Sequence, residues 1–249
     1  MGPDLALALR LADAADALSA ERFRTGLAIE TKADLTPVTE ADRAVEAEIR
    51  RLLADARPDD AILGEEEGAA GTGARRWIVD PIDGTRNYAR GIPVWATLVA
   101  LEVDGEVRVG VASAPALGRR WWAERGAGAF ADGERIHVST VSSVEQAVLS
   151  FALESEVPAL AGRAWHARGF GDFWAHMLVA EGAADGAVDA AGVSEWDLAA
   201  VRVIIEEAGG RFSDFSGESR IDRGTAVSSN GPIHEELLAA VAGENRPGL

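Results

Sequence analysis

The chain has 249 residues and no cysteine, and its 24 Lys and Arg against 41 Asp and Glu give a formal net charge of −17. This acidity argues against general nucleic-acid binding, which needs clustered Lys and Arg, and the missing thiols exclude disulfide frameworks, zinc–thiolate sites and Cys nucleophiles. No stretch resembles a membrane span or a signal peptide, so we expect a cytoplasmic protein without membrane or nucleic-acid partners.

The N-terminal part of the chain is predicted to form two helices joined by an extended segment. Apolar residues at helical spacing favour a helix over 4–24, with one face formed by Leu7, Leu11, Ala15 and Leu18. Residues 31–38 contain Pro37 and are typical of a loop or extended segment. Thr39 followed by Asp42 indicates a helix start, and the helix should end before Pro58.

The next segments favour a largely antiparallel sheet. Residues 61–64 are a short apolar segment, and residues 68–74 are expected to form a flexible turn. A strand is expected at 77–79, with Asp80 at its end. Alternating apolar residues around Asp104-Gly105 predict a hairpin with arms 95–103 and 107–112. A second hairpin should carry Trp121-Trp122 on one arm, with Asp132-Gly133 near the next turn.

The remaining residues alternate between strands and helices, which indicates an α/β arrangement. The expected strands are 148–152, 187–190, 212–215 and 225–229, and the expected helices are 172–181, 197–208 and 235–242. We place a boundary near residue 143. It divides the chain into an N-terminal α+β half, 1–143, and a C-terminal α/β half, 144–249, packed intimately as one structural unit.

The segment WIVDPIDGTRN carries the clearest chemical signal. Pro81 fixes a tight turn between Asp80 and Asp83, so both carboxylates can face one cleft and share cations, while the amides of Gly84 and Thr85 can face an anion. That combination suits a metal-assisted phosphate site. An Asx turn followed by a helix capped by Asp83 remains an alternative interpretation.

Two other acidic features also have two interpretations each. The run Glu65, Glu66 and Glu67 can supply cation ligands or be a charged loop. Asp197 can join the same site or cap the helix that follows it.

Taken together, GEEEG, WIVDPIDGTRNYARG, EWDLAAVRVIIEEAGG and TKADLTPVTEAD resemble the inositol monophosphatase family, and the resemblance runs from end to end. It implies a layered αβαβα fold of mixed α/β (α+β) type, homodimers, and a lithium-sensitive phosphomonoesterase activity that depends on two or three Mg²⁺ ions. The substrate would be a small phosphate monoester.

The resemblance also implies a role for each matching residue. Glu65, Asp80 and the carbonyl of Ile82 would bind one Mg²⁺, and Asp80, Asp83 and Asp197 a second. Glu65 or Glu66 would support a third ion, while Thr85 and Asp42 would help to activate water. Asp83 and the amides of Gly84 and Thr85 would lie against the phosphate.

Two further carboxylates bear on the substrate. Asp172 follows a glycine after which inositol-cleaving members carry Ser or Thr, and Asp189 lies near a position where those members have Glu. Extra negative charge near the leaving group suits a cationic substrate. Several segments look most similar to histidinol-phosphate phosphatases of the family, so we expect hydrolysis of L-histidinol phosphate in histidine biosynthesis.

Alternatives to this reading remain open. The chain could prefer inositol-1-phosphate with broad sugar-phosphate tolerance, or it could be a non-catalytic metal-binding regulator. Asp172 could instead be a helix N-cap or pair with Arg168 across a dimer, and Asp189 could be a surface acid at a strand end. His176 is predicted to be a core or interface residue, the tryptophans Trp95, Trp121 and Trp122 to fill the core, and Trp196 to support Asp197.

Overall fold

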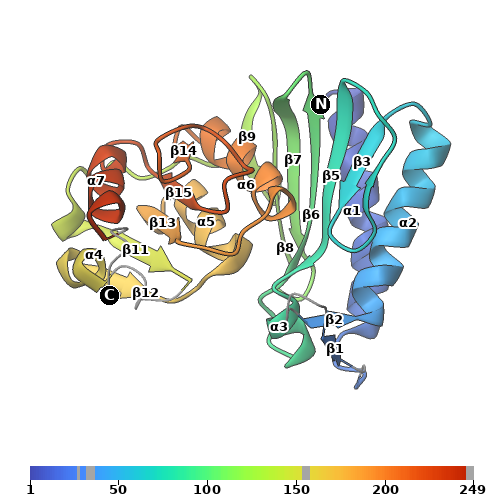
Figure 1. Ribbon diagram of the computed structural model, residues 1–249, viewed down its shortest axis with the longest axis horizontal. Coiled ribbons are helices and arrows are strands. Elements are labelled where there is room, and N and C mark those ends of the chain that lie inside the picture. The colour runs from blue at the N-terminus through green and yellow to red at the C-terminus, as the bar shows by residue number, and fades with distance from the viewer. Residues whose placement is uncertain (27–28, 32–36, 153–157, 245–249) are drawn as a thin grey trace.

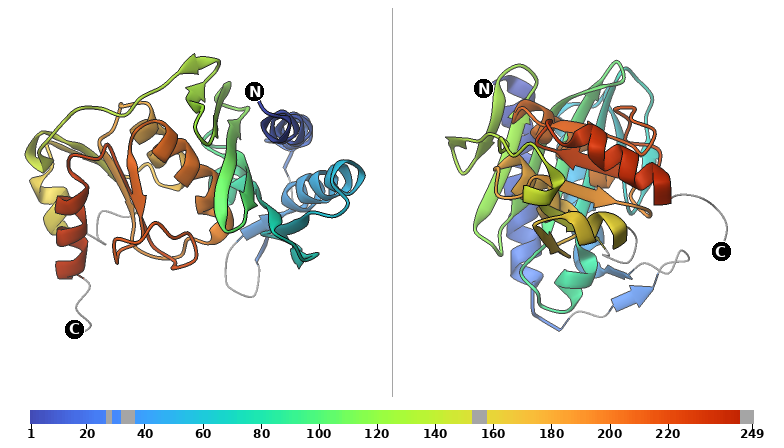
Figure 2. Two further views of the ribbon diagram at one scale, coloured as in Figure 1. Left: turned by 90° about the horizontal axis from the view of Figure 1, so that it is seen from above. Right: turned by 90° about the vertical axis from the view of Figure 1, so that its left-hand side faces the viewer.

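The computed structural model describes residues 1–26, 29–31, 37–152 and 158–244. Helices and sheets alternate in layers, which Figure 1 shows from the front and Figure 2 from above. This arrangement confirms the predicted αβαβα architecture. In the described part of the chain, no helix is long and apolar enough to cross a membrane.

The first sheet has eight strands in the order β10-β9-β8-β7-β6-β5-β3-β4. Its neighbours are antiparallel except for the parallel pair β3–β5. The strands are β3 (Ala61–Gly64), β4 (Gly68–Ala70), β5 (Arg75–Asp83), β6 (Ala96–Val103), β7 (Glu106–Ala114), β8 (Arg119–Glu124), β9 (Gly128–Ala131) and β10 (Glu134–Arg135). The first predicted hairpin is formed by β6 and β7. The strand with Trp121 and Trp122, β8, turns into β9 at residues 125–127, and Asp132-Gly133 forms the following turn between β9 and β10.

The second sheet has five strands in the order β12-β11-β13-β15-β14. β11 pairs in parallel with β12 and β13, whereas β15 pairs antiparallel with β13 and β14. Its strands are β11 (Val148–Phe151), β12 (His166–Arg168), β13 (Gly186–Asp189), β14 (Arg211–Ser213) and β15 (Ala226–Ser229). A separate small sheet joins β1 (Ile29–Thr31) to β2 (Pro37–Thr39).

The helices form the remaining layers. α1 (Pro3–Arg22) and α2 (Glu40–Ala56) cover the outer face of the first sheet, and α5 (Asp172–Ala180) and α6 (Glu195–Glu207) lie between the two sheets. α4 (Pro158–Arg163) and α7 (His234–Glu244) cover the outer face of the second sheet. The short helix α3 (Thr85–Ala89) follows β5, and one 3₁₀ turn spans Val144–Gln146.

The alternation of side chains along β5 decides to which face of the sheet each site residue points. Trp77 and Val79 join the apolar cluster under α1 and α2, whereas Ile78 joins the cluster between the sheets. Because successive strand residues point to opposite faces, Asp80 shares the inner face with Ile78 and points toward α6. The position of Asp80 in the strand thus brings a carboxylate into the middle of the molecule.

The two sheets are joined through α6, which packs tightly on β7. A Cβ added to Gly110 would lie 2.5 Å from Cγ1 of Val203 and 2.7 Å from the carbonyl oxygen of Ala200. Only glycine therefore allows this approach of the helix to the strand. The last strand of the first sheet ends at Arg135 and the second sheet begins at Val148, while the boundary near residue 143 stays a prediction.

Several local predictions need correction. The expected turn at 68–74 contains strand β4, since its backbone pairs with β3, and β5 continues through Pro81 to Asp83 with a shift of register after Asp80. The helix α4 and the edge strand β12 were not predicted. Of the segment 31–38, residues 32–36 lie outside the described residues, and its flanks form β1 and β2.

Candidate active site

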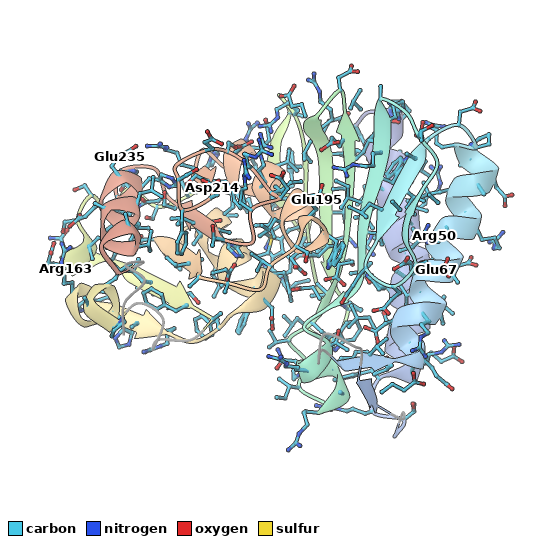
Figure 3. All side chains as sticks on the ribbon, in the orientation of Figure 1. Arg50, Glu67, Arg163, Glu195, Asp214 and Glu235 are labelled. Atoms are coloured by element: carbon cyan, nitrogen blue, oxygen red, sulfur yellow. The ribbon has the colours of Figure 1, made fainter. Side chains whose placement is uncertain are left out.

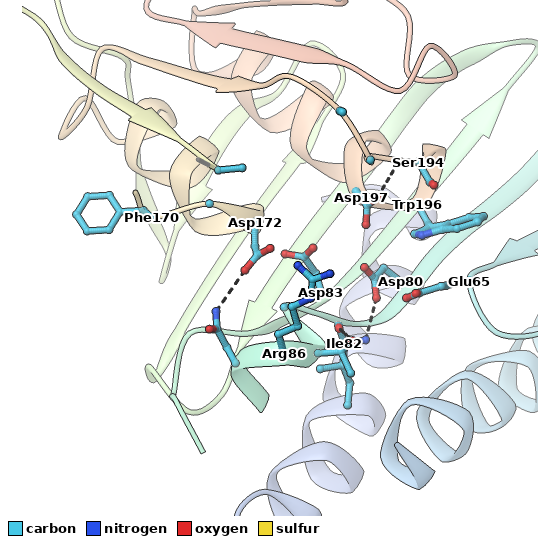
Figure 4. A pocket seen from close by; sticks show the side chains of 17 residues that line it. Glu65, Asp80, Ile82, Asp83, Arg86, Phe170, Asp172, Ser194, Trp196 and Asp197 are labelled. Carbon is cyan, nitrogen blue, oxygen red and sulfur yellow. Dashed lines mark hydrogen bonds between the residues drawn. The ribbon is translucent and has the colours of Figure 1, made fainter. Parts of the chain in front are cut away.

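A cleft of about 500 Å³ opens where the end of β5 and α3 meet the N-termini of α5 and α6. In Figure 4, the carboxylates of Asp80, Asp83, Asp172 and Asp197 point toward one another in this cleft. Most of the predicted site residues line it, namely Glu65, Asp80, Ile82, Asp83, Gly84, Thr85, Asp172 and Asp197. Asp42 and Glu66 are not among its lining residues, and Asp189 lines an adjoining lobe.

The centre of the cleft is a cluster of three carboxylates. One oxygen each from Asp80, Asp83 and Asp197 lies within 4.8 Å of the others. Asp80 is held by an Asx turn, in which its Oδ1 accepts the amide proton of Ile82 at 2.9 Å. Asp197 occupies the third position of α6 and accepts the amide proton of Ser194 at 2.6 Å. Ser194 is therefore the N-cap, so the interpretation of Asp197 as the cap was wrong.

Asp83 is fixed from the opposite side of the cleft. Its Oδ2 accepts the backbone amide proton of Phe173 at 2.7 Å, which ties the end of β5 to the first turn of α5. The N-cap of α3 is Gly84 and not Asp83. Gly84 has a left-handed backbone with φ +82°, and a Cβ there would lie 3.1 Å from the carbonyl oxygen of Val94. The Asp83 carboxylate is therefore not used to cap α3, and it faces the carboxylate cluster.

Thr85 connects the cleft to Asp42 behind it. The Thr85 hydroxyl lies 2.9 Å from the carbonyl oxygen of Ile82 and 3.2 Å from Oδ1 of Asp42. Oδ2 of Asp42 accepts from both the amide and the hydroxyl of Thr39, at 2.8 and 2.6 Å, within the predicted capping box of α2. Because a hydroxyl has one proton, Thr85 can donate to only one of its two acceptors at a time.

Glu46 supports the Glu65–Glu67 turn and was not predicted as a site residue. Its fully buried carboxylate accepts the amide protons of Glu66 at 2.7 Å and Glu67 at 3.0 Å, and it pairs with Arg50. Arg50 also reaches Glu67 at 3.4 Å, and Figure 3 shows these two side chains together beside α2. The sequence held one indication of this role: Glu46 follows Val45 on the apolar face of the predicted helix, where a charged residue needs a partner.

Burial and mutual repulsion disfavour negative charge on these carboxylates. The pKa of Asp80 is raised well above its ordinary value, first by burial and then by the negative charges of Glu65, Asp83 and Asp197. The pKa of Asp83 is also well raised, by burial and then by Asp172 and Asp197. Burial raises the pKa of Asp197 to about 7, against the opposing hydrogen bond from Ser194. A cation between these groups would relieve both effects.

The donor set fits a hard divalent cation such as Mg²⁺. All candidate ligands are oxygens, which Mg²⁺ prefers, and oxygens around an octahedral ion at about 2.1 Å lie roughly 3 to 4 Å apart. The three carboxylate oxygens within 4.8 Å of one another are close to that arrangement. The carbonyl oxygen of Ile82 lies 2.9 Å from the Thr85 hydroxyl, and even when it accepts that proton its second lone pair can bind a cation.

A second lobe of about 400 Å³ continues from the cleft toward α5 and β13. Asp172, His176 and Asp189 line it, and it shares Asp83 and Asp197 with the main cleft. Asp189 is only 4% exposed, so the interpretation as a surface acid was wrong. Its Oδ2 lies 2.7 Å from Nε2 of His176, which is buried as predicted.

Asp172 stands between the two lobes in a strained backbone. It is the first residue of α5 after the N-cap Gly171, so it is not itself the cap, and its φ is +49°. Left-handed backbone at a non-glycine residue concentrates at functional sites. Asn87 donates to Oδ2 of Asp172 at 3.2 Å, and burial followed by repulsion from Asp189 raises the pKa of Asp172 to about 6. Its pairing with Arg168 across a dimer stays a prediction.

The tryptophans mainly fill the interior. Trp95 and Trp121 are fully buried, and Trp122 is partly buried against the cluster beneath α1 and α2. Trp196 is partly buried, packs on the cluster between the sheets and lines the cleft beside Asp197. These positions confirm the core role predicted for Trp95 and Trp121.

The chain as a whole is similar to several known proteins. The inositol monophosphatase family profile matches residues 3–246. A histidinol-phosphatase from Mycobacterium tuberculosis is 51% identical over 251 residues, covering 94% of this chain and 96% of the relative. One from Streptomyces coelicolor is 48% identical over 254 residues, covering 94% and 95%. Among solved structures, a Thermotoga maritima IMPase matches with a TM-score of 0.90 at 33% identity and covers 98% of each chain.

Proposed function

Since the chain belongs to the inositol monophosphatase family and is a phosphoric monoester hydrolase, we propose that it hydrolyses L-histidinol phosphate to L-histidinol and phosphate, using Mg²⁺. The observation that carries this proposal is the acidic second lobe beside the carboxylate cluster. Histidinol carries an ammonium group and an imidazole, and carboxylates suit such a leaving group. The two relatives described above as histidinol-phosphatases support the same substrate.

We assign the metal ligands as the family resemblance implies. Glu65, Asp80 and the Ile82 carbonyl would hold one ion, and Asp80, Asp83 and Asp197 another, with Glu65 or Glu66 near a third. Bound Mg²⁺ would neutralise the charge of the phosphate and favour deprotonation of water. The close approach of Asp80, Asp83 and Asp197 and their raised pKa values support this assignment.

The protein's own groups would position the attacking water and the ester. When Thr85 donates its proton to Asp42, its oxygen lone pairs can accept a hydrogen bond from water in the cleft. Asp42 is kept in place by two bonds from Thr39, so it can hold the proton that passes along this line. The amides of Gly84 and Thr85 would contact the phosphate, and Asp172 and Asp189 would face the alcohol part of the ester.

The charge of the residues that line the two lobes also favours some phosphate esters over others. Arg86 is the one arginine or lysine among the described residues that line either lobe. A bisphosphate would place its second phosphate near Asp172 and Asp189 with little positive charge to receive it. Inositol-1-phosphate has a neutral alcohol part and stays the alternative substrate.

Phosphate release from L-histidinol phosphate, inositol-1-phosphate and fructose-1,6-bisphosphate, each with Mg²⁺ and with EDTA, tests the proposal. We expect Mg²⁺-dependent turnover with the highest kcat/KM for histidinol phosphate. Equal or better turnover of inositol-1-phosphate would refute the substrate. No turnover of any ester would favour the non-catalytic regulator. The Asp83→Asn variant should keep the fold and lose several orders of magnitude in kcat, because a ligand charge is lost.

We further propose a cytoplasmic homodimer that lithium inhibits. The family resemblance supports the dimer and the lithium effect. Light scattering would give the mass of the purified protein, and phosphate release in increasing LiCl would measure inhibition.

A further inference from the structure

A chain of three buried polar side chains leads from the second sheet into the second lobe. The Ser228 hydroxyl on β15 lies 2.7 Å from Nδ1 of His176 on α5, and Nε2 of His176 lies 2.7 Å from Oδ2 of Asp189 on β13. Ser228, His176 and Asp189 are 0%, 1% and 4% exposed. Since a carboxylate accepts and does not donate, the Nε2 proton of His176 points at Asp189.

The contact with His176 uses Oδ2 of Asp189 and does not involve Oδ1. Within the described residues, no hydrogen bond reaches Oδ1, yet Oδ1 is not one of the fully buried unpaired side-chain atoms. Because Asp189 lines the second lobe, its Oδ1 is reached from that lobe. His176 therefore sets which oxygen the lobe presents to a ligand.

The lobe lies where the alcohol part of a phosphate ester would sit. It shares Asp83, Asp172 and Asp197 with the main cleft, so a phosphate at the carboxylate cluster leaves the rest of the molecule beside Asp189. Asp172 adds a second carboxylate to the same wall, anchored by Asn87 at 3.2 Å. A group with an ammonium charge complements this wall better than a neutral hydroxyl.

We propose that His176 is a positioning residue for substrate specificity, which fixes Asp189 so that Oδ1 receives an ammonium group on the alcohol part of the ester. The inference rests on the proposed function and adds a residue that the sequence motifs do not identify. His176 does not touch the reacting phosphate. It selects phosphate monoesters with a cationic alcohol by holding one carboxylate oxygen in place.

Amide side chains can separate the two contacts of His176. Glutamine places an N–H near the position of Nε2 and can keep the Asp189 contact, whereas asparagine reaches only the position of Nδ1, toward Ser228. We expect His176→Asn to raise KM for histidinol phosphate by about tenfold or more, since a hydrogen bond to a charged group is lost. KM for glycerol-2-phosphate, a neutral alcohol, should change less than twofold. His176→Gln should stay near wild type, and kcat should change little in both variants.

His234 offers a matched control. It is also fully buried and lies between two serines, 2.8 Å from Ser229 and 3.0 Å from Ser213, at the start of α7 on the other side of the second sheet. His234→Asn should disturb the fold to a similar extent, measured by Tm, without changing the ratio of the two KM values. An equal rise in KM for both esters in His176→Asn, or the same change of ratio in His234→Asn, would overturn the inference.

A binding measurement separates this inference from the proposed function. Calorimetry with L-histidinol, the cationic product, should show binding to the wild type that weakens about tenfold in His176→Asn and persists in His176→Gln. If no ester is hydrolysed but this pattern is found, the proposed function fails and the positioning role stands. If histidinol phosphate is hydrolysed but histidinol binds all three proteins equally, the positioning role fails alone.

Discussion

Replacing Gly84 with alanine tests how far the backbone between Asp83 and Thr85 decides both stability and activity. Gly84 has φ +82°, and an added Cβ would lie 3.1 Å from the carbonyl oxygen of Val94 and 3.4 Å from Oδ2 of Asp172. The left-handed backbone alone costs alanine about 1–2 kcal/mol, of which roughly 0.4–1 kcal/mol is offset by the stiffer unfolded chain. The close contact adds about 1–3 kcal/mol, as in other overpacked sites.

Gly105 provides the matched control for the cost of placing alanine in a left-handed backbone. It has φ +80° in the turn between β6 and β7, and nothing lies within 4 Å of its added Cβ. We expect Gly105→Ala to lower the free energy of unfolding by about 1 kcal/mol or less and to leave phosphate release unchanged. Gly84→Ala should lose about 2 kcal/mol or more and at least tenfold in kcat/KM, because the amides proposed to contact the phosphate must move.

Urea unfolding followed by circular dichroism, together with phosphate release, measures both effects. A difference of 1 kcal/mol corresponds to roughly 2–4 °C in Tm for a chain of this size, so a thermal scan also resolves it. Equal losses of stability in the two variants would show that the Val94 contact relaxes without cost. Full activity of Gly84→Ala would refute the idea that this backbone positions the phosphate.

Three other changes test the packing and the electrostatics of the site. Gly110→Ala should lower stability by about 1–3 kcal/mol in urea unfolding, because Val203 and α6 must move off β7; an unchanged midpoint would contradict this. Glu46→Gln should weaken Mg²⁺ binding about tenfold by calorimetry while the circular dichroism spectrum stays the same, and equal affinity would count against its support of the Glu65 turn. In EDTA, stability should fall as pH rises from about 4 to about 7, because the pKa of Asp197 is raised to about 7 and the folded chain keeps a proton that the unfolded chain releases. Mg²⁺ should restore Tm most strongly at the upper end of this range, and a pH-independent Tm in EDTA would refute the reasoning.

Local chemistry made much of the architecture predictable. Thr39 and Asp42 form the expected capping box, and Asp104-Gly105 turns the expected hairpin. Both features depend on residues close in sequence. The motif around Asp80 and Asp83 likewise indicated the cleft, because strand alternation and a proline turn act within a few residues.

Features set by tertiary pairing were missed. β4 lies in a glycine-rich segment whose strand character comes from its bonds to β3 and not from propensity. The alternative interpretation of Asp197 as an N-cap was also wrong, because Ser194, three residues earlier, caps α6. The contact between His176 and Asp189 joins a helix to a strand, so neither residue alone indicates it.

The bond from the Phe173 amide to Asp83 links two parts of the site that have different tasks. Asp83 belongs to the carboxylate cluster, while Phe173 follows Asp172 in the first turn of α5, which forms the wall of the second lobe. If the Asp83 carboxylate shifts when an ion binds, the hydrogen bond to Phe173 therefore also shifts the backbone that carries Asp172. Binding free energies are reciprocal, so a ligand that orders this turn must raise cation affinity by the same factor by which the cation raises affinity for the ligand.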